Sequence, residues 1–422
     1  MYEESLGDIH GWVYQCASLG DDPDMKFLFI SNYINHHQIP LCEAIMRLIG
    51  DENFIFAQTQ PMEEERVRMG WGVDVYSLPY VKIYDNDKIN TLNAINDSDI
   101  VLLGWTENEE VRNACLQRAE AGKPLLRMSE RIYREGQWKA ISPKGLIAKY
   151  KEHIRFRNKK VYMLCNGAYV ASDFALIGAY PHKMFRWGYF PEVREYTPEQ
   201  MRSMKRMEDN KTPRILWAGR FMEGVKHPEF ALELAAYLKE KNYSFHIDVV
   251  GNGEMDKDLK DYVEENRLTD VVTFHGFLPP NRVRQMMEEA HIYLFTSNNL
   301  EGWGAVVNEA MNAGCAVVAG SMAGAVPYLI HDGENGYIYD GENLNSFLKK
   351  AEALVRHPSR QQKFGNNAYD TITKLWNSNI AAQRLIDFCT AILKDKDYIA
   401  PSDGPMSLAP VIKPYIKPDE IK

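Results

Sequence analysis

Short runs of apolar residues alternate with segments of helical periodicity along most of this chain. In the first half the apolar runs predict strands at residues 26–31, 53–58, 99–104, 124–128, 161–165 and 184–189. In the second half they predict strands at residues 214–218, 244–250, 271–276, 291–296, 315–319 and 336–339. Strands that alternate with helices are typical of parallel sheets built from βαβ units. The pattern therefore predicts an α/β protein with two doubly wound, Rossmann-like parallel sheets.

A charged segment separates the two halves. Residues 192–211 contain almost no large aliphatic side chain, and we expect them to link an N-terminal domain of residues 1–191 to a C-terminal domain of residues 212–375. Residues 376–394 carry apolar positions at helical spacing, which predicts a C-terminal helix that packs back on the N-terminal domain. Residues 395–422 combine several prolines with few aliphatics, which predicts a loosely ordered tail.

Composition narrows the class of protein. The 422 residues are 45% hydrophobic and 25% charged, which is ample for two buried cores, and the net charge of −9 lacks the basic footprint of a nucleic-acid-binding chain. The six cysteines form no CxxC pair, so buried free thiols are expected and structural zinc is not. Neither a secretory signal nor an apolar run of membrane-spanning length is evident, and these features predict a cytoplasmic protein.

The most informative motif is EGWGAVVNE at residues 301–309, which follows a predicted strand and opens a helix. Its glycines let backbone amides approach a ligand, and a helix N-terminus favours an anion there. Glu301 and Glu309 flank this anion site, where carboxylates can accept hydrogen bonds from sugar and ribose hydroxyls. The motif suits a sugar nucleotide, although both glutamates could instead be solvated surface charges.

Three earlier loops also stand at predicted strand ends. Arg220 and Lys226 lie six residues apart before a helix, where a guanidinium and an ammonium could bind a diphosphate, or simply form an exposed basic loop. Gly253 closes a Gly-x-Gly turn that lacks the third glycine of a dinucleotide fingerprint, so NAD is not indicated. Phe277 follows the next strand and could face a nucleobase, or pack in the core.

In this order, the four loops resemble the nucleotide-sugar-binding half of retaining glycosyltransferases of family 4, which have the GT-B fold. The resemblance covers about residues 214–339 and includes AGAVP at residues 323–327 and DGENGY at residues 332–337. It implies that Arg220 and Lys226 hold the donor diphosphate, that Glu301 contacts the transferred sugar and that Glu309 contacts the ribose. It further implies donor contacts through the backbone of residues 302–306, whose members are Gly302, Trp303, Gly304, Ala305 and Val306. Trp303 replaces a commoner Phe, from which we expect little functional consequence.

The N-terminal half carries weaker signals. Asn35, His36 and His37 occupy a polar loop after the first strand, where members of the family often have a glycine-rich loop. In this position they could bind the acceptor, and His37 could move a proton, or one histidine could cap the helix that starts at Pro40. Glu130 is a further catalytic candidate where many family members have a histidine, although a salt-bridged, structural Glu130 fits equally well.

A local basic segment interrupts the acidic chain. Residues 127–160 hold eleven Lys or Arg against three acidic residues, with four large aromatics interleaved. Such a segment could touch an anionic membrane or a lipid-linked acceptor, which would make the protein peripheral at the inner face of the membrane, or it could be a solvated face.

These features together predict a retaining, metal-independent glycosyltransferase that needs no cofactor. It would move a sugar from a nucleoside diphosphate sugar, with UDP favoured, to a hydroxyl of a saccharide or lipid-linked saccharide. A metal-dependent transferase with an Asp-x-Asp motif is an alternative, since residues 85–87, 256–258 and 395–397 match that pattern. A sugar-nucleotide epimerase of the same fold and a non-catalytic carbohydrate-binding subunit are two others.

Overall fold

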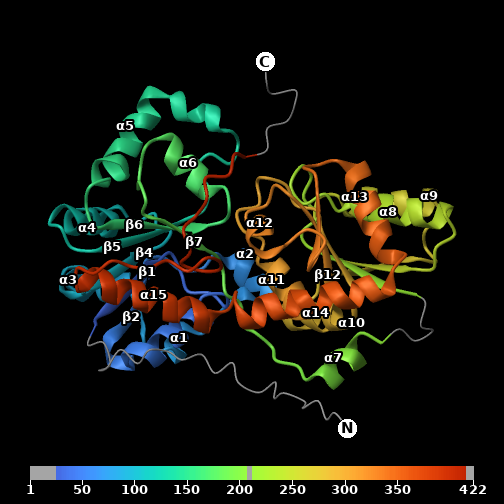
Figure 1. The fold of residues 1–422 in the computed structure, drawn as a ribbon, viewed down its shortest axis with the longest axis horizontal. Coiled ribbons are helices and arrows are strands. Elements are labelled where there is room, and N and C mark those ends of the chain that lie inside the picture. Colours follow the sequence, from blue (N-terminus) through green and yellow to red (C-terminus); the bar gives the residue numbers. More distant parts are fainter. Residues whose placement is uncertain (1–24, 207–211, 415–422) are drawn as a thin grey trace, which may run out of the picture.

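The computed structural model describes residues 25–206 and 212–414, which form two parallel sheets side by side (Figure 1). The first sheet has the order β3-β2-β1-β4-β5-β6-β7. Its strands are β1 (Phe27–Ser31), β2 (Phe54–Gln58), β3 (Val81–Ile83), β4 (Ile100–Leu103), β5 (Leu125–Ser129), β6 (Val161–Asn166) and β7 (Met184–Trp187). The second sheet has the order β10-β9-β8-β11-β12-β13. Its strands are β8 (Arg214–Ala218), β9 (His246–Val250), β10 (Val272–Gly276), β11 (Ile292–Phe295), β12 (Ala316–Gly320) and β13 (Gly336–Tyr339).

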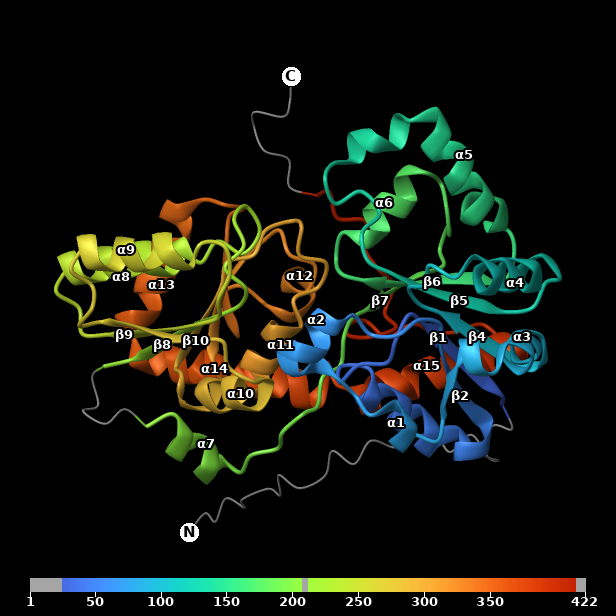
Figure 2. The same cartoon turned by 180° about the vertical axis from the view of Figure 1, so that it is seen from behind.

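Helices cover both faces of each sheet, as the predicted βαβ pattern requires (Figures 1 and 2). The helices that follow strands of the first sheet are α1 (Ile39–Ile49), α2 (Glu64–Arg66), α3 (Lys88–Asp97), α4 (Glu109–Glu120), α5 (Pro143–Glu152) and α6 (Val170–Leu176). Those of the second sheet are α8 (Glu229–Glu240), α9 (Asp256–Glu265), α10 (Pro280–Glu289), α11 (Ala305–Asn312), α12 (Val326–Leu329), α13 (Leu344–Val355) and α14 (Pro358–Lys374). Two doubly wound parallel sheets are thus confirmed.

In both sheets the chain reverses its winding direction at one point, between β1 and β4 in the first and between β8 and β11 in the second. In open sheets of this kind, ligands bind outside the carboxyl ends of the strands at that point. The predicted site loops after β8 and β11 therefore flank one crevice. The loop with Asn35, His36 and His37 flanks the other, because it follows β1.

The segment between the sheets is more structured than a simple linker. It contains α7 (Pro198–Met204), which begins with a capping box in which Thr197 and Gln200 satisfy each other's backbone amides. Met201 is buried, and Lys205 Nζ donates to the carbonyl of Met287 at 2.7 Å. This helix therefore packs on the C-terminal domain at the amino ends of its strands.

The last helix, α15 (Ser378–Leu393), packs against α1 of the N-terminal domain (Figures 1 and 2). Its Phe388 ring lies 4.9 Å from the rings of both Tyr162 and Phe185. The expected loose tail is wrong for residues 395–414. Met406 donates to the carbonyl of Arg186 at 2.9 Å, the Arg186 amide donates back to Ser407, and Met406 is fully buried. These backbone bonds fix the segment to the free edge of β7; residues 415–422 lie outside the described part.

Candidate active site

An ion pair between Lys226 and Glu301 joins the loops after β8 and β11. The two side chains are 21% and 18% exposed, so the charges are largely withdrawn from water. The sequence suggested separate roles for them, Lys226 at the diphosphate and Glu301 at the sugar. The structure instead brings them into direct contact, so that a ligand phosphate would compete with Glu301 for Lys226.

Buried Asn298, which no sequence motif singles out, ties these loops together. Its amide donates to the Val225 carbonyl at 3.0 Å, and its Nδ2 donates to the Gly224 carbonyl at 2.8 Å. The Glu301 amide in turn donates to the Asn298 carbonyl at 3.1 Å. Because buried backbone groups need partners, Asn298 fixes the relative position of Lys226 and Glu301.

Helix α11 opens at Gly304, as the motif predicted. Gly304 has a φ of 94°, and an added Cβ would lie 2.5 Å from the Phe295 ring, so only glycine fits this turn. Ala305 and Val306 are partly exposed in the first turn, where their amides can receive an anion. Glu309 lies one turn further on and is half-buried.

Within the described residues, the Glu309 carboxylate makes no hydrogen bond or ion pair. Burial raises its pKa above the ordinary range, and the more distant Arg284 and Arg194 partly oppose that shift. A half-buried acceptor without a protein partner is suited to ribose hydroxyls, the role that the resemblance implies.

Gly302 and Trp303 lie at a seam between the domains. Trp303 is 1% exposed, its Nε1 donates to Asn308 Oδ1 at 2.8 Å, and its ring packs 5.9 Å from the Trp376 ring. The Gly302 carbonyl oxygen would lie 2.0 Å from a Cβ added to Gly324 and 3.0 Å from one added to Gly167, and a Cβ added to Gly302 would meet the Glu130 carboxylate. Trp303 thus supports the motif from the core, and donor contact through its backbone stays a prediction.

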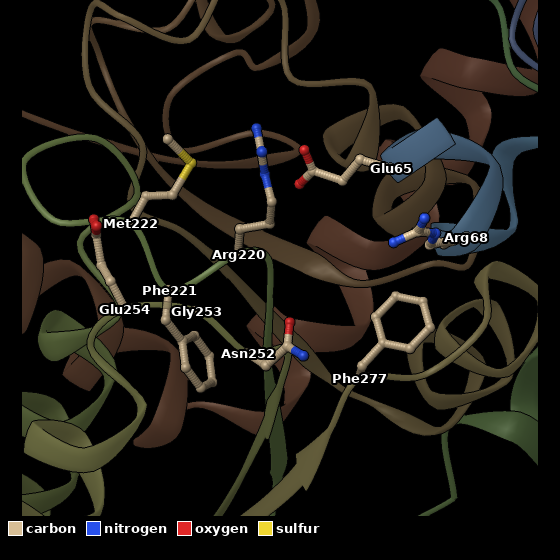
Figure 3. Close-up of a pocket in the computed structure, with 9 residues that line it drawn as sticks. All are labelled: Glu65, Arg68, Arg220, Phe221, Met222, Asn252, Gly253, Glu254 and Phe277. Carbon is tan, nitrogen blue, oxygen red and sulfur yellow. The ribbon is translucent and has the colours of Figure 1, made fainter. Parts of the chain in front are cut away.

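A cavity of about 410 Å³ opens at the carboxyl ends of β8, β9 and β10 (Figure 3). Arg220, Gly253 and Phe277 all line it, as the predicted donor-binding loops require. The Arg220 guanidinium has no ion-pair or hydrogen-bond partner among the described residues. Phe277 is 47% exposed, so its alternative assignment to the core is wrong.

Close packing explains why the turn beside the cavity carries two glycines, Gly251 and Gly253. Gly253 has a φ of 156°, and an added Cβ would lie 2.5 Å from the Phe221 carbonyl oxygen. Gly251 likewise meets the carbonyl of Gly219. These close approaches bring the loops after β8 and β9 together, so the Gly-x-Gly turn shapes the cavity wall.

On the N-terminal side, the rings of the two histidines pack together, tilted by 48° with centroids 3.9 Å apart. Neither one caps α1, because the N-cap is Gln38 and no side-chain hydrogen bond caps the helix. Asn35 Oδ1 accepts from the His37 amide at 3.0 Å and shapes the turn. Burial, with a smaller contribution from His36, lowers the pKa of His37 to about 3, and its Nδ1 is buried without a partner. His37 is therefore neutral at ordinary pH.

Glu130 follows β5 and reaches the opposite domain. It forms an ion pair with Arg134, accepts from Tyr189 Oη at 2.9 Å, and lies directly against Gly302. Asn299 Nδ2 also donates to the Arg134 carbonyl at 2.7 Å. Glu130 is thus salt-bridged and also faces the sugar-binding motif, so its catalytic role stays a prediction.

The sequence analysis missed three residues near the site. Glu65 and Arg68, from the N-terminal domain, line the cavity beside Arg220 (Figure 3). Trp105 is 65% exposed directly after β4, at the point where the first sheet reverses its winding. A large apolar residue directly after a predicted strand is a signal that could have identified Trp105. Glu65 and Arg68 reach the cavity only because of how the two domains meet, and the sequence holds no signal for that contact.

The basic segment at residues 127–160 only partly lies on the surface. Arg127 is buried and bonds the Glu152 carbonyl, and Tyr133 and Phe156 are buried as well. Trp138 and Tyr150 are 67% and 57% exposed. The exposed large aromatics of the segment therefore lie on α5 and the turn before it.

Residues 25–206 and 212–414 contain neither a candidate metal site nor a helix that could span a membrane. No three His, Cys, Asp or Glu side chains of that range gather where they could hold a metal ion. None of its helices is both long and apolar enough to cross a membrane. Metal independence remains a prediction.

Part of the chain matches a known protein family. Residues 201–371 match the family model described as glycosyl transferases group 1. The putative colanic acid biosynthesis glycosyltransferase WcaL of Escherichia coli (strain K12) is 27% identical over 155 residues, which are 31% of this chain and 38% of WcaL. The amylovoran biosynthesis glycosyltransferase AmsK of Erwinia amylovora is 30% identical over 130 residues, which are 30% of this chain and 31% of AmsK. The alignments thus span about a third of the length of these relatives.

Solved structures extend the likeness to both domains. Anabaena HepE in complex with UDP and glucose superimposes with a TM-score of 0.60 at 14% identity, over 87% of this chain and all of that one. The lipopolysaccharide outer core galactosyltransferase WaaB superimposes with a TM-score of 0.62 at 16% identity, over 88% of this chain and all of that one. At such identities the likeness concerns the fold. Residues 201–371 of this chain thus match the glycosyl transferases group 1, and its two domains have the GT-B fold of these solved structures.

Proposed function

We propose that this chain moves a sugar from UDP to a hydroxyl group of a saccharide or lipid-linked saccharide, with retention at the anomeric carbon. The observation that carries this proposal is the set of charged groups at one strand-end crevice. There the Lys226–Glu301 pair joins the loops after β8 and β11, and among residues 25–206 and 212–414 neither the Arg220 guanidinium nor the Glu309 carboxylate has a hydrogen-bond or ion-pair partner. The complex of HepE with UDP and glucose supports UDP as the nucleotide.

In this reaction the bond between the sugar C1 and the diphosphate oxygen breaks, and the acceptor oxygen bonds to C1. The acceptor hydroxyl loses its proton to a phosphate oxygen of the leaving UDP or to solvent. Negative charge grows on the diphosphate as the bond breaks. Arg220, Lys226 and the amides of Ala305 and Val306 stabilise this charge. Glu301 orients the sugar, and Glu309 holds the ribose.

The acceptor binds on the N-terminal side of the cleft, beside Asn35, His36 and His37. Because His37 is neutral and its buried Nδ1 lacks a partner, it suits hydrogen bonding to an acceptor hydroxyl better than binding a phosphate. The relatives named for colanic acid and amylovoran biosynthesis support a growing polysaccharide as the acceptor class.

Nucleotide binding gives the first test. Calorimetry with UDP, GDP and ADP should show the tightest binding for UDP, and the protein should need no added metal. A ligand at about 100 times its Kd should stabilise the fold by about 2.7 kcal/mol, a shift that thermal unfolding detects. Absence of binding to any nucleoside diphosphate would overturn the donor proposal.

Product analysis separates the remaining alternatives. Incubation with UDP-sugar and a saccharide acceptor should release UDP and a glycoside of unchanged anomeric configuration, with equal rates in EDTA and in Mn²⁺. An epimerase would alter the nucleotide sugar without an acceptor, and a non-catalytic subunit would bind UDP-sugar but turn nothing over. A metal-dependent transferase would lose its activity in EDTA.

We also propose that the protein contacts an anionic membrane surface through α5. This helix has no buried residue, and Figures 1 and 2 show it at the outer rim of its domain. The α5 surface is the set of exposed apolar side chains on this helix and the turn before it: Trp138, Ile141, Leu146, Ile147 and Tyr150. At 100° per residue, Leu146, Ile147 and Tyr150 share one side, flanked by Lys144, Lys149 and Lys151. An apolar stripe between lysines is typical of helices that lie in an anionic lipid interface.

Vesicle flotation tests this contact. The wild type should bind phosphatidylglycerol vesicles, bind phosphatidylcholine vesicles poorly, and detach in high salt. The triple variant Trp138→Ser, Ile147→Ser and Tyr150→Ser should lose this binding. Ile89→Ser, which removes a 74% exposed apolar side chain from α3, should not. Equal binding by both variants would contradict the proposal.

A further inference from the structure

A short segment of the N-terminal domain reaches the nucleotide cavity from the opposite side. It consists of α2 and the π-helical turn η2 (Val67–Trp71), which follow β2 at the carboxyl edge of the first sheet. Trp71 holds the segment to the histidine loop, with its ring edge-on to His36 at 5.2 Å and to His37 at 5.7 Å. Arg66 stacks over the same indole with Cζ 5.2 Å from the ring centroid. The segment is therefore fastened at its end to the proposed acceptor side.

The same segment meets the C-terminal domain at Gly70. This residue has a φ of 76°, which interrupts the helical turn, and an added Cβ would lie 3.3 Å from Cδ of Pro280 in the first turn of α10. The left-handed turn allows the chain to pass close to α10. Segment and cavity thus belong to one contact between the domains.

Two side chains of this segment enter the cavity wall. Figure 3 shows Glu65 and Arg68 directed into the cavity from the N-terminal side, opposite Arg220 and Phe277. The Arg68 guanidinium lies toward the side occupied by the Phe277 ring, whereas Arg220 stands toward the side of Met222. The cavity accordingly has an end with the exposed Phe277 ring and the Arg68 guanidinium, and an end where the Arg220 guanidinium faces the Glu65 carboxylate.

Arg68 is available to a ligand at little cost. Among the residues that the structure describes, it pairs with Glu64 alone, at 3.1 Å and one helical turn earlier, and the two side chains are 80% and 89% exposed. Exposed pairs at this spacing contribute only about 0.3–0.5 kcal/mol. A guanidinium is planar and weakly hydrated, so it stacks well on flat aromatic groups.

We propose that Arg68 is a nucleotide-binding residue supplied by the N-terminal domain. Its guanidinium covers one face of the donor base, whose other face lies on Phe277, while the diphosphate extends toward Arg220 and Lys226. This inference rests on the proposed function, because it assigns a contact to the donor named there. In this arrangement the bound nucleotide contacts both domains at once.

Binding measurements on matched variants test this assignment. Calorimetry should give a Kd for UDP that is about 5- to 30-fold higher for Arg68→Ala than for the wild type, the range expected for loss of one stacking partner. Arg68→Lys should recover little, because an ammonium has no planar face. Inorganic pyrophosphate, which has no base, should bind Arg68→Ala as well as the wild type but bind Arg220→Ala less well.

Two controls separate the guanidinium from its surroundings. Glu65→Ala changes the same segment and the same cavity wall, and should not weaken UDP binding. Arg202→Ala removes an exposed, ion-paired arginine at the opposite edge of the sheet, and should leave UDP binding unchanged.

Several results would overturn the assignment. Normal UDP binding by Arg68→Ala, or an equal loss in Glu65→Ala, would reject Arg68 as a contact. An equal loss of pyrophosphate binding in Arg68→Ala would move it from the base to the phosphates. In each of these cases the donor proposal would stand. A wild type that binds no nucleoside diphosphate would overturn both.

Discussion

The two faces of the cleft hold their charged groups in different ways. On the C-terminal face, the side chains of Arg220 and Glu309 have no hydrogen bond or ion pair to any residue of the described chain. On the N-terminal face, Glu130 is held by Arg134 and Tyr189. Groups without protein partners are available to a ligand, whereas held groups fix the shape of the cleft. Substitution of Arg220 or Glu309 should therefore change binding and turnover first, and substitution of Glu130 should change stability first.

Glu301 gives the largest expected effect and the sharpest test of the C-terminal face. Glu301→Gln should lower the rate of sugar transfer by about 100- to 1,000-fold, because it removes the charge that orients the donor sugar and pairs with Lys226. Initial rates with the donor identified by calorimetry measure this loss. Glu334→Gln, at a 75% exposed position, is the control. Full turnover by Glu301→Gln would remove Glu301 from the site.

Glu130 tests the opposite face. Glu130→Ala should lower the free energy of unfolding by about 1–3 kcal/mol, because Arg134 and Tyr189 lose their acceptor. Urea unfolding measures this change. Glu135→Ala is a matched control, since Glu135 forms an exposed ion pair with Lys139 at the same spacing and should change stability little. If Glu130→Ala abolished turnover at unchanged stability, Glu130 would be catalytic and the distinction between the faces would fail.

Arg220 should show the reverse behaviour. Arg220→Ala should raise the Kd for UDP about tenfold, because it removes a charge-assisted contact to the diphosphate. Since the guanidinium has no partner in the described chain, the free energy of unfolding should stay within about 0.5 kcal/mol of the wild type. A loss of stability larger than the loss of affinity would contradict the comparison.

The smallest expected effect is a pH dependence from Glu309. UDP needs the carboxylate form of Glu309 as an acceptor, so its affinity should be constant at high pH and fall several-fold as the pH falls through the raised pKa. The effect of Glu309 on stability has the opposite sign. Its pKa is higher in the folded than in the unfolded chain, so its contribution to the free energy of unfolding increases as pH falls. Glu309→Gln should flatten the pH dependence of UDP affinity, and an unchanged dependence would assign it to another group.

Most strands were predictable because strands of parallel sheets are buried on both faces and form continuous apolar runs. All five residues of β1, for instance, are buried. β3 was missed because its three residues, with an exposed lysine at the centre, are too short for a pattern. The tail at residues 395–414 was misjudged for another reason. Backbone hydrogen bonds to the edge of β7 hold it there, and backbone bonds leave little trace in side-chain type.

Within the site, prediction succeeded where one sheet fixes the geometry. Arg220, Gly253 and Phe277 follow three adjacent strands, so their order along the chain was enough to bring them to one cavity. It failed where two domains meet. Arg68 reaches the same cavity only because the domains dock at Gly70 and Pro280, and no local pattern records that docking.

The chain crosses between the domains twice, and both crossings touch the same indole. Gly188, directly after β7, lies against the Trp303 ring, and Trp376, directly before α15, packs 5.9 Å from it. A rotation of one domain against the other about this indole would displace each residue in proportion to its distance from the indole. Glu301 lies two residues from Trp303 along the chain. Phe277 follows β10, which lies three positions from β11 in the sheet, or about 14 Å at the usual strand spacing. Such a rotation would widen the cleft more at the base than at the sugar, so the product UDP would leave base first.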